Sequence, residues 1–162
     1  MIIFGIDPGY ERLGIAVLKK YPGENKEEII FSECFKTSAK LDFADRLYLI
    51  GEEIKKIIKK YKPDILAIET LFFTSNQKTV MQVAEIRGVA IYEAKKAKLE
   101  IFEASPPQIK MAITGYGRAN KEQIMKMVKI LLKEAGSVKS DDELDAIAIA
   151  LTGFAYIKSH IK

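Results

Sequence analysis

The chain begins with MIIFGIDPG (residues 1–9), an apolar run that ends at an aspartate and a Pro-Gly pair. A short apolar run bounded by a turn signal predicts a buried strand, here over residues 1–7. Two further runs of strand-forming residues follow at 13–20 and 27–37, and the turn sequence YPGEN separates them. The three runs together predict an antiparallel meander at the start of a sheet.

Beyond this meander the hydrophobic pattern changes to the helical period. Apolar residues recur every three or four positions along residues 41–62, and Pro63 ends the helix that this pattern predicts. The remaining predicted elements are a strand at 64–69, a helix at 79–98, a strand at 99–104, and helices that start at Ser105, Asn120 and Ser140. Each of these three polar residues is followed three positions later by Gln or Glu, which is the capping-box pattern.

This order of elements predicts an α/β fold. Three strands in a meander followed by right-handed crossovers give one five-stranded mixed sheet with helices on both faces. A length of 162 residues suits one domain, residues 1–162, and no repeat or linker divides it. If the strands at 1–7 and 64–69 are parallel neighbours, their carboxyl ends meet where open α/β sheets place their sites.

The composition of the chain indicates its cellular location and the kinds of partner it can bind. The single Cys34 cannot form an internal disulfide, which favours a reducing, cytoplasmic location. No apolar stretch approaches the length of a membrane span and the N-terminus lacks a signal-peptide pattern, so we expect no membrane partner. The formal net charge of +4 permits a polyanionic partner such as nucleic acid.

Four acidic residues stand where a local structural role explains them poorly. Asp7 ends the first strand, although Asp-Pro-Gly is also ordinary turn chemistry. Glu69 ends the strand at 64–69 after an apolar run, a buried position in which a glutamate is seldom unpaired. In SDDELDAIAIA (140–150), Asp142 and Asp145 are three apart and share a helix face. The helix dipole favours acids in the first turn, but Asp145 lies beyond it.

Carboxylates that converge without basic partners require a cation. Hard oxygen ligands select Mg²⁺ or Mn²⁺, and four carboxylates suit a two-metal arrangement with ions about 3.5–4 Å apart. An acidic site on a basic protein fits a nuclease, because lysines can hold the nucleic-acid backbone while carboxylates hold the metal.

Four segments, in order along the chain, carry a resemblance to a known family. They are GIDPG (5–9), AIET (67–70), GYGRANKEQI (115–124) and DELDAIAIA (142–150), and together they resemble the RuvC family of Holliday-junction resolvases. The resemblance implies a ribonuclease H-like fold and a homodimer. It also implies Mg²⁺-dependent paired nicking of four-way DNA junctions in recombination and repair, which leaves 5′-phosphate and 3′-hydroxyl ends. Cooperation with the RuvA–RuvB branch-migration complex is implied as well.

The resemblance also implies roles for particular residues. Its metal carboxylates fall on Asp7, Glu69, Asp142 and Asp145, and the pattern Asp-x-x-Asp-Ala selects Asp142 over the neighbouring Asp141. Two lysines that the family uses near the scissile phosphate fall on Lys110 and Lys121, although a solvated lysine is the default for any lysine here. The family aromatic that stacks on a base of the opened junction falls on Phe72, and Phe73 is then expected to anchor the loop in the core.

Assembly and the competing functions complete these expectations. The helix at 79–98 is apolar on more than one face, so the surplus apolar face is assigned to a dimer interface. A nuclease of the same fold that cuts structured RNA is the main alternative, and a panel of substrates separates the two. An actin-like ATPase, suggested by GIDPG, needs a second domain for which the chain has no room, and a non-catalytic junction-binding protein would not need the four carboxylates.

Overall fold

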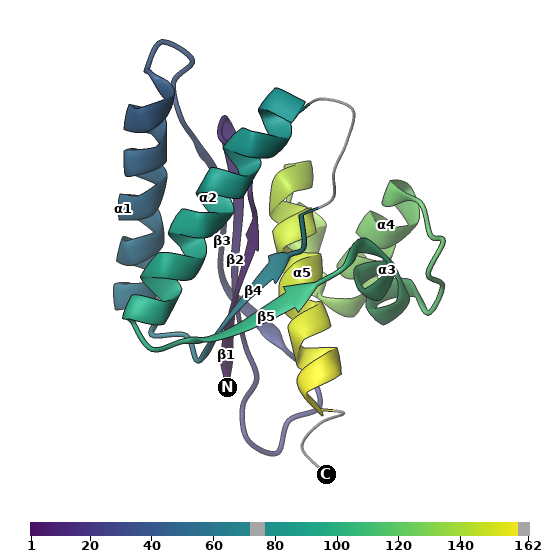
Figure 1. Ribbon diagram of the computed structural model, residues 1–162. Coiled ribbons are helices and arrows are strands. Elements are labelled where there is room, and N and C mark those ends of the chain that lie inside the picture. The colour runs from purple at the N-terminus through teal and green to yellow at the C-terminus, as the bar shows by residue number, and fades with distance from the viewer. Residues whose placement is uncertain (72–76, 159–162) are drawn as a thin grey trace.

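The computed structural model describes residues 1–71 and 77–158 of the chain and shows a central sheet between two layers of helices (Figure 1). The strands are β1 (Ile2–Asp7), β2 (Arg12–Lys19), β3 (Glu28–Lys36), β4 (Ile65–Glu69) and β5 (Glu100–Ala104). The helices are α1 (Phe43–Tyr61), α2 (Gln77–Lys96), α3 (Pro106–Thr114), α4 (Lys121–Leu131), the 3₁₀ helix η1 (Lys133–Ser137) and α5 (Asp141–Lys158). Only η1 was not predicted from the sequence.

The sheet has the strand order β3-β2-β1-β4-β5. β1, β2 and β3 pair antiparallel, whereas β1, β4 and β5 pair parallel, so β1 separates the meander from the crossover half. The predicted five-stranded mixed sheet is therefore confirmed, and so is the parallel pairing of the strands that end in Asp7 and Glu69.

Helices cover both faces of the sheet, as predicted. α1 and α2 pack together on one face, where the core includes Phe4, Ile54 and Leu66. α5 covers the opposite face, and α3 and α4 pack on its outer side (Figure 1). None of the helices within the described residues is both long enough and apolar enough to cross a membrane.

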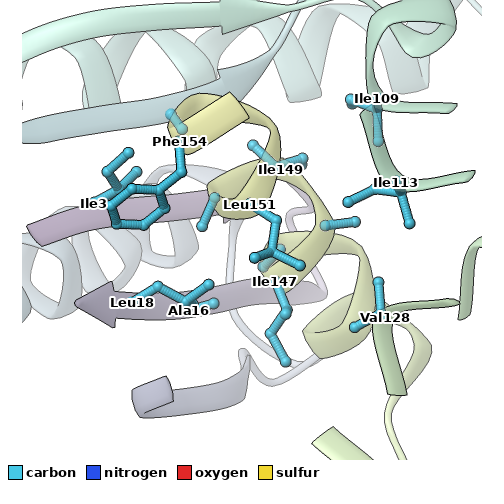
Figure 2. Close-up of a cluster of buried hydrophobic side chains, with 14 of the residues drawn as sticks. Ile3, Ala16, Leu18, Ile109, Ile113, Val128, Ile147, Ile149, Leu151 and Phe154 are labelled. Carbon is cyan, nitrogen blue, oxygen red and sulfur yellow. The ribbon is translucent and has the colours of Figure 1, made fainter. Parts of the chain in front are cut away.

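α5 is a central element of its layer, since it has neighbours on both sides. Its side chains pack on the sheet and also against α3 and α4, and Figure 2 shows this cluster with Ile147, Ile149 and Leu151 of α5, Ile3 and Leu18 of the strands, and Ile109, Ile113 and Val128 of α3 and α4. Residues Ala146 to Phe154 of α5 are all buried. The apolar sequence that follows Asp145 is thus explained by burial on nearly every side.

The ends of several helices follow from local chemistry. At the start of α4, the side chains of Asn120 and Gln123 each accept a hydrogen bond from the other's backbone N–H, as the capping-box pattern predicts. At the start of α3, the Gln108 side chain accepts from the backbone N–H and hydroxyl of Ser105. α3 ends at Gly115, whose left-handed φ of 70° suits glycine. These caps fix where α3 and α4 begin, and with them the backbone around Lys110 and Lys121.

Candidate active site

Two parallel strands end in carboxylates at one edge of the sheet. β1 and β4 are in register through Ile6 and Ile68, so the next residues, Asp7 and Glu69, leave the sheet next to each other. Asp7 also pairs with Gly14 of β2, and Gly14 lies against the start of α5. Three segments that are far apart in the sequence therefore meet at this edge, as the sequence pattern predicted.

Glycines in the strands allow the backbone of α5 to come close to the sheet. A Cβ atom built on Gly14 would lie 2.0 Å from the carbonyl oxygen of Asp142, and one built on Gly5 would lie 2.3 Å from that of Ala146. Neither position has room for a side chain, so the helix backbone rests directly on the strands. This contact sets the distance of Asp142 and Asp145 from the carboxylates of the sheet.

Asp7, Glu69 and Asp145 line one cavity of about 250 Å³, together with Lys110 of α3 and Lys121 of α4. The remaining wall is formed by Pro106, Ile109, Ile124, Ala148 and Ile149. Five of the residues singled out in the sequence are thus brought together around a small space with an apolar wall.

Burial and neighbouring acidic residues disfavour the charged forms of the three carboxylates of the cavity. Burial, followed by the charges of Asp145, Glu69 and Asp142, raises the pKa of Asp7 from 3.8 to about 7, although Lys121 opposes the shift. Burial is also the largest cause that raises the pKa of Glu69, where Asp145 adds to it and Arg87 and Lys110 oppose it.

The pKa of Asp145 is raised in the same way. Burial is again the main cause, Asp141 and Asp142 add to it, and Lys121 opposes it. A positive charge bound next to these acids would favour their ionised forms and lower their pKa values.

Lys121 provides part of that positive charge. Its ammonium nitrogen lies 3.1 Å from Asp145 and 3.6 Å from Asp141. Burial acts to lower the pKa of Lys121, but the hydrogen bond and the charge of Asp145, with Asp141 and Asp7, outweigh it and raise the pKa. Lys110 acts on the site through its charge, which lowers the pKa of Glu69.

Asp142 is held by different partners. Its Oδ2 atom lies 2.6 Å from Nη2 of Arg12 and also accepts hydrogen bonds from the Ser140 hydroxyl at 3.3 Å and the Cys34 thiol at 3.6 Å. Among the described residues, Asp142 is not part of the cavity wall that contains Asp7. Its charge nevertheless reaches the site, because it contributes to the raised pKa of Asp7.

The premise that these acids converge without basic partners is therefore wrong for two of them. Arg12 pairs with Asp142, and Lys121 pairs with Asp145. Arg12 was missed because its contact with α5 spans more than a hundred residues of sequence. Its position in GYERLG, on the strand that returns from Asp7, was the available signal.

Arg87 of α2 is a second residue that the sequence pattern did not reveal. Its Nε donates to the backbone carbonyl of Glu69 at 2.8 Å, and its guanidinium also pairs with Glu103. Arg87 thereby joins the ends of β4 and β5. It also lines a second cavity of about 270 Å³ that shares Asp7, Glu69 and Pro106 with the first.

The donor set fits a hard divalent cation. No three Asp, Glu, His or Cys side chains within residues 1–71 and 77–158 already lie close enough together to enclose an ion. The cavity nevertheless presents carboxylate oxygens, the ligands that Mg²⁺ and Mn²⁺ prefer, and a bound cation would offset the burial and the neighbouring negative charges that raise the pKa of Asp7. Phe72 and Phe73, assigned to base stacking and to the core, lie outside the described residues.

The sequence of the chain matches a known family over most of its length. A family model described as crossover junction endodeoxyribonuclease RuvC matches residues 3–153. The chain belongs to the RuvC family. RuvC-family nucleases are metal-dependent, in keeping with the carboxylates of the cavity.

Named relatives and a solved structure extend this match over most of the chain. The crossover junction endodeoxyribonuclease RuvC of Ruminiclostridium cellulolyticum is 44% identical over 151 residues, which cover 93% of this chain and 90% of that protein. The RuvC of Alkaliphilus metalliredigens is 45% identical, with 93% and 91% covered. The solved T. thermophilus RuvC in complex with Holliday junction substrate has a TM-score of 0.91 and 29% identity, and 99% of this chain and 96% of that one are covered. The family, the enzyme class and the ribonuclease H-like fold expected from the sequence are confirmed.

Proposed function

We propose that the protein is a Holliday-junction resolvase, a metal-dependent endonuclease that makes symmetrical paired nicks in four-way DNA junctions during homologous recombination and repair. The observation that carries this proposal is the cavity in which Asp7, Glu69 and Asp145 meet Lys110 and Lys121, in a chain of the RuvC family. A solved relative that is similar over 99% of this chain is described with a Holliday junction substrate, which supports the same substrate here.

Asp7, Glu69 and Asp145, with Asp142 as the fourth carboxylate, are proposed to hold two Mg²⁺ ions, for which Mn²⁺ can substitute. When bound, such ions activate a water for attack on the phosphodiester and stabilise the leaving oxygen. These carboxylates have to be deprotonated to bind a metal. Because the pKa of Asp7 is about 7, Asp7 is partly protonated near neutral pH, and a metal has to displace this proton. Ile109, Ile124 and Ile149 form an apolar part of the wall around these groups.

Lys110 and Lys121 are proposed to act on the scissile phosphate. Both line the cavity from the side opposite the sheet, on helices whose starts are capped. Lys121 pairs with Asp145 at 3.1 Å, and an ammonium group there can turn to the charge that develops on the phosphate during cutting. Phe72 is proposed to stack on a base of the opened junction, at about 1–3 kcal/mol per stacked base.

A homodimer is proposed to place two such sites so that strands of like polarity are cut in one junction. α2 buries Ile86 and Ala90 against the sheet and α1, yet it leaves Met81 65% and Tyr92 63% exposed. A helix that is apolar on a second face is typical of a subunit interface. The proposal includes a single nuclease domain over residues 1–162, a cytoplasmic location, 5′-phosphate and 3′-hydroxyl products, and cooperation with RuvA–RuvB.

The test of this function is cleavage of a mobile four-way DNA junction in Mg²⁺, with the cut positions mapped on all four strands. We expect paired nicks on strands of like polarity, and less cutting of duplex DNA, flaps and structured RNA. Glu69→Gln and Asp145→Asn should each abolish cutting but keep junction binding in EDTA, because loss of negative charge does not weaken attraction to a polyanion. Asp42→Asn, on an exposed carboxylate at the start of α1, is the matched control. Preferential cutting of RNA, or a near wild-type rate in either site variant, would overturn the proposal.

The dimer is tested separately by sedimentation at micromolar concentration. We expect a dimer for the wild-type chain and dissociation for Tyr92→Glu, which places a charge on the exposed face of α2. A wild-type monomer that still makes paired nicks would contradict the interface assigned to α2.

A further inference from the structure

Arg12 lies beside the site without belonging to its cavity. It is the first residue of β2, and its backbone is in register with Lys36 of β3. Two residues further along β2, Gly14 lies against the carbonyl oxygen of Asp142, so the start of β2 faces the start of α5. From this position the guanidinium of Arg12 reaches Asp142 at 2.6 Å and the hydroxyl of Ser140 at 3.4 Å.

The turn that precedes Arg12 is held in place by the segment after β3. The hydroxyl of Thr37 donates to the carbonyl of Tyr10, and the backbone N–H of Thr37 donates to the carbonyl of Glu11. The buried Arg46 of α1 lies 4.0 Å from the Glu11 carboxylate and donates to the carbonyl of Ser38. Anchored in this way, the backbone at Arg12 has little freedom to carry its side chain away from α5.

Within residues 1–71 and 77–158, the contacts of the Asp142 carboxylate fall on one of its two oxygens. Arg12, Ser140 and Cys34 all contact its Oδ2 atom, and they come from β2, from the segment before α5 and from β3. Among the charges that raise the pKa of Asp7, that of Asp142 ranks below those of Asp145 and Glu69. Asp142 is thus paired with side chains of β2 and β3, while the other three carboxylates line the cavity.

We infer that Arg12 is a positioning residue that holds Asp142 outside the cavity and competes with a divalent metal for this carboxylate. The inference rests on the proposed metal role of Asp142. The guanidinium of an arginine is not deprotonated in proteins, so the pair cannot be released by loss of a proton from Arg12. Movement of Asp142 into the cavity to bind a metal therefore has to work against its ion pair with Arg12, and the strength of this pair lowers the affinity of the site for the ion.

The size of the effect follows from the exposure of the pair. The Arg12 side chain is 51% exposed and that of Asp142 26%, so solvent screens their attraction. Ion pairs of this kind correspond to a factor of about two to five in an equilibrium constant. Removal of the Arg12 charge should therefore tighten binding of a divalent ion by about two- to five-fold.

If Arg12 instead helped Asp142 to bind the metal, removal of its charge would weaken metal binding. Groups that hydrogen-bond to a metal-binding carboxylate often hold it in the orientation that binds the metal, and their loss weakens metal binding. If Arg12 fixed Asp142 for metal binding in this way, its removal would lower the affinity. The direction of the change thus separates competition from orientation.

The experiment is a titration of the DNA-free full chain with Mn²⁺. Electron paramagnetic resonance measures the concentration of unbound Mn²⁺ at each step. Arg12→Gln should bind Mn²⁺ about two- to five-fold more tightly than wild type, and Arg12→Lys should stay close to wild type because it keeps the charge. Lys36→Gln is the matched control, because it removes the same charge from the exposed residue opposite Arg12 in β3. In the Asp142→Asn background, Arg12→Gln should have no effect.

Each outcome bears on a different statement. Unchanged or weaker Mn²⁺ binding by Arg12→Gln, with wild type binding normally and Asp142→Asn binding weakly, would overturn the inference and leave the proposed metal site standing. An equal gain from Lys36→Gln, or a gain that persists with Asp142→Asn, would also overturn it, since bulk charge would then suffice. No Mn²⁺ binding by wild type, or full binding by Asp142→Asn, would overturn the metal role of Asp142 itself. Arg12→Glu, which should also tighten binding, repeats the test if Arg12→Gln fails to fold.

Discussion

Replacement of Asp7 by asparagine should make the metal-free protein more stable at neutral and alkaline pH. The folded protein raises the pKa of Asp7 from 3.8 to about 7, chiefly by burial. In the unfolded chain this carboxyl returns to its ordinary pKa. Between about pH 4 and pH 7 the folded state therefore holds a proton that the unfolded state gives up, and wild-type stability falls as the pH rises.

The magnitude follows from the difference between the two pKa values. At about 1.4 kcal/mol per pKa unit, the loss is about 0.5 kcal/mol at pH 4 and up to about 4 kcal/mol at pH 8. Asparagine has nearly the same shape as the protonated acid and is neutral at every pH. We therefore expect the free energies of unfolding of Asp7→Asn and wild type to be similar at pH 4, and the variant to be about 2–4 kcal/mol more stable at pH 8.

Guanidinium denaturation in EDTA at pH 4.5, 6 and 8 measures this difference. Asp42→Asn, at an exposed helix N-cap where Asn serves as well as Asp, should leave stability unchanged at all three values. Addition of Mg²⁺ should then stabilise wild type more than Asp7→Asn. A ligand that binds the folded state stabilises the protein, and the variant lacks one of the proposed metal-binding carboxylates. A difference between variant and wild type that is the same at pH 4.5 and pH 8, or a less stable variant at pH 8, would refute the reasoning.

Three further changes test other parts of the site. Lys121→Ala should lower the single-turnover cutting rate by about 10²-fold at saturating protein, as expected for a charge aimed at the transition state, whereas Lys55→Ala on α1 should shift only the salt dependence slightly. Equal losses from the two would indicate bulk charge. Phe72→Ala should slow cutting of a fully paired junction strongly and recover much of the rate on a junction with mismatches at the cut site; an equal loss on both substrates, with a lower Tm, would indicate a core role instead. Gly14→Ala should destabilise the protein by about 2 kcal/mol or more, measured by thermal unfolding, because its Cβ would meet the α5 backbone, while Gly136→Ala, with nothing within 4 Å, should change little.

Most of the fold was predictable because each element carries its own local signal. The change of hydrophobic period after residue 41 separates the meander from the first helix, and polar caps at Ser105 and Asn120 mark where later helices start. The 3₁₀ helix Lys133–Ser137 has no such signal, since five residues show no period. The convergence of Asp7 and Glu69 followed from the parallel pairing of two strands, which the order of elements implied.

The pairing of charges at the site was not predictable from local patterns. Arg12 and Asp142 meet because β2 lies against α5 at Gly14, a contact that depends on strand register and on the fit of one backbone against another. Arg87 reaches the end of β4 from the third turn of α2, and its partners are a backbone carbonyl and Glu103, neither of which leaves a motif in the sequence. Such contacts require the three-dimensional structure, because any of the 26 basic residues could in principle supply them.

Because the α5 backbone contacts β1 and β2 directly, the α5 side of the sheet tolerates fewer substitutions than the α1–α2 side. On the α1–α2 side, large side chains such as Ile54 and Leu66 mesh with one another, and a change in one can be absorbed by repacking of the next. Under α5, at Gly5 and Gly14, no side chain stands between helix and strand to take up a change. Substitutions can therefore accumulate on the α1–α2 side of the core without moving the residues of the site. On the α5 side, a single added methyl group would move both Asp142 and Asp145.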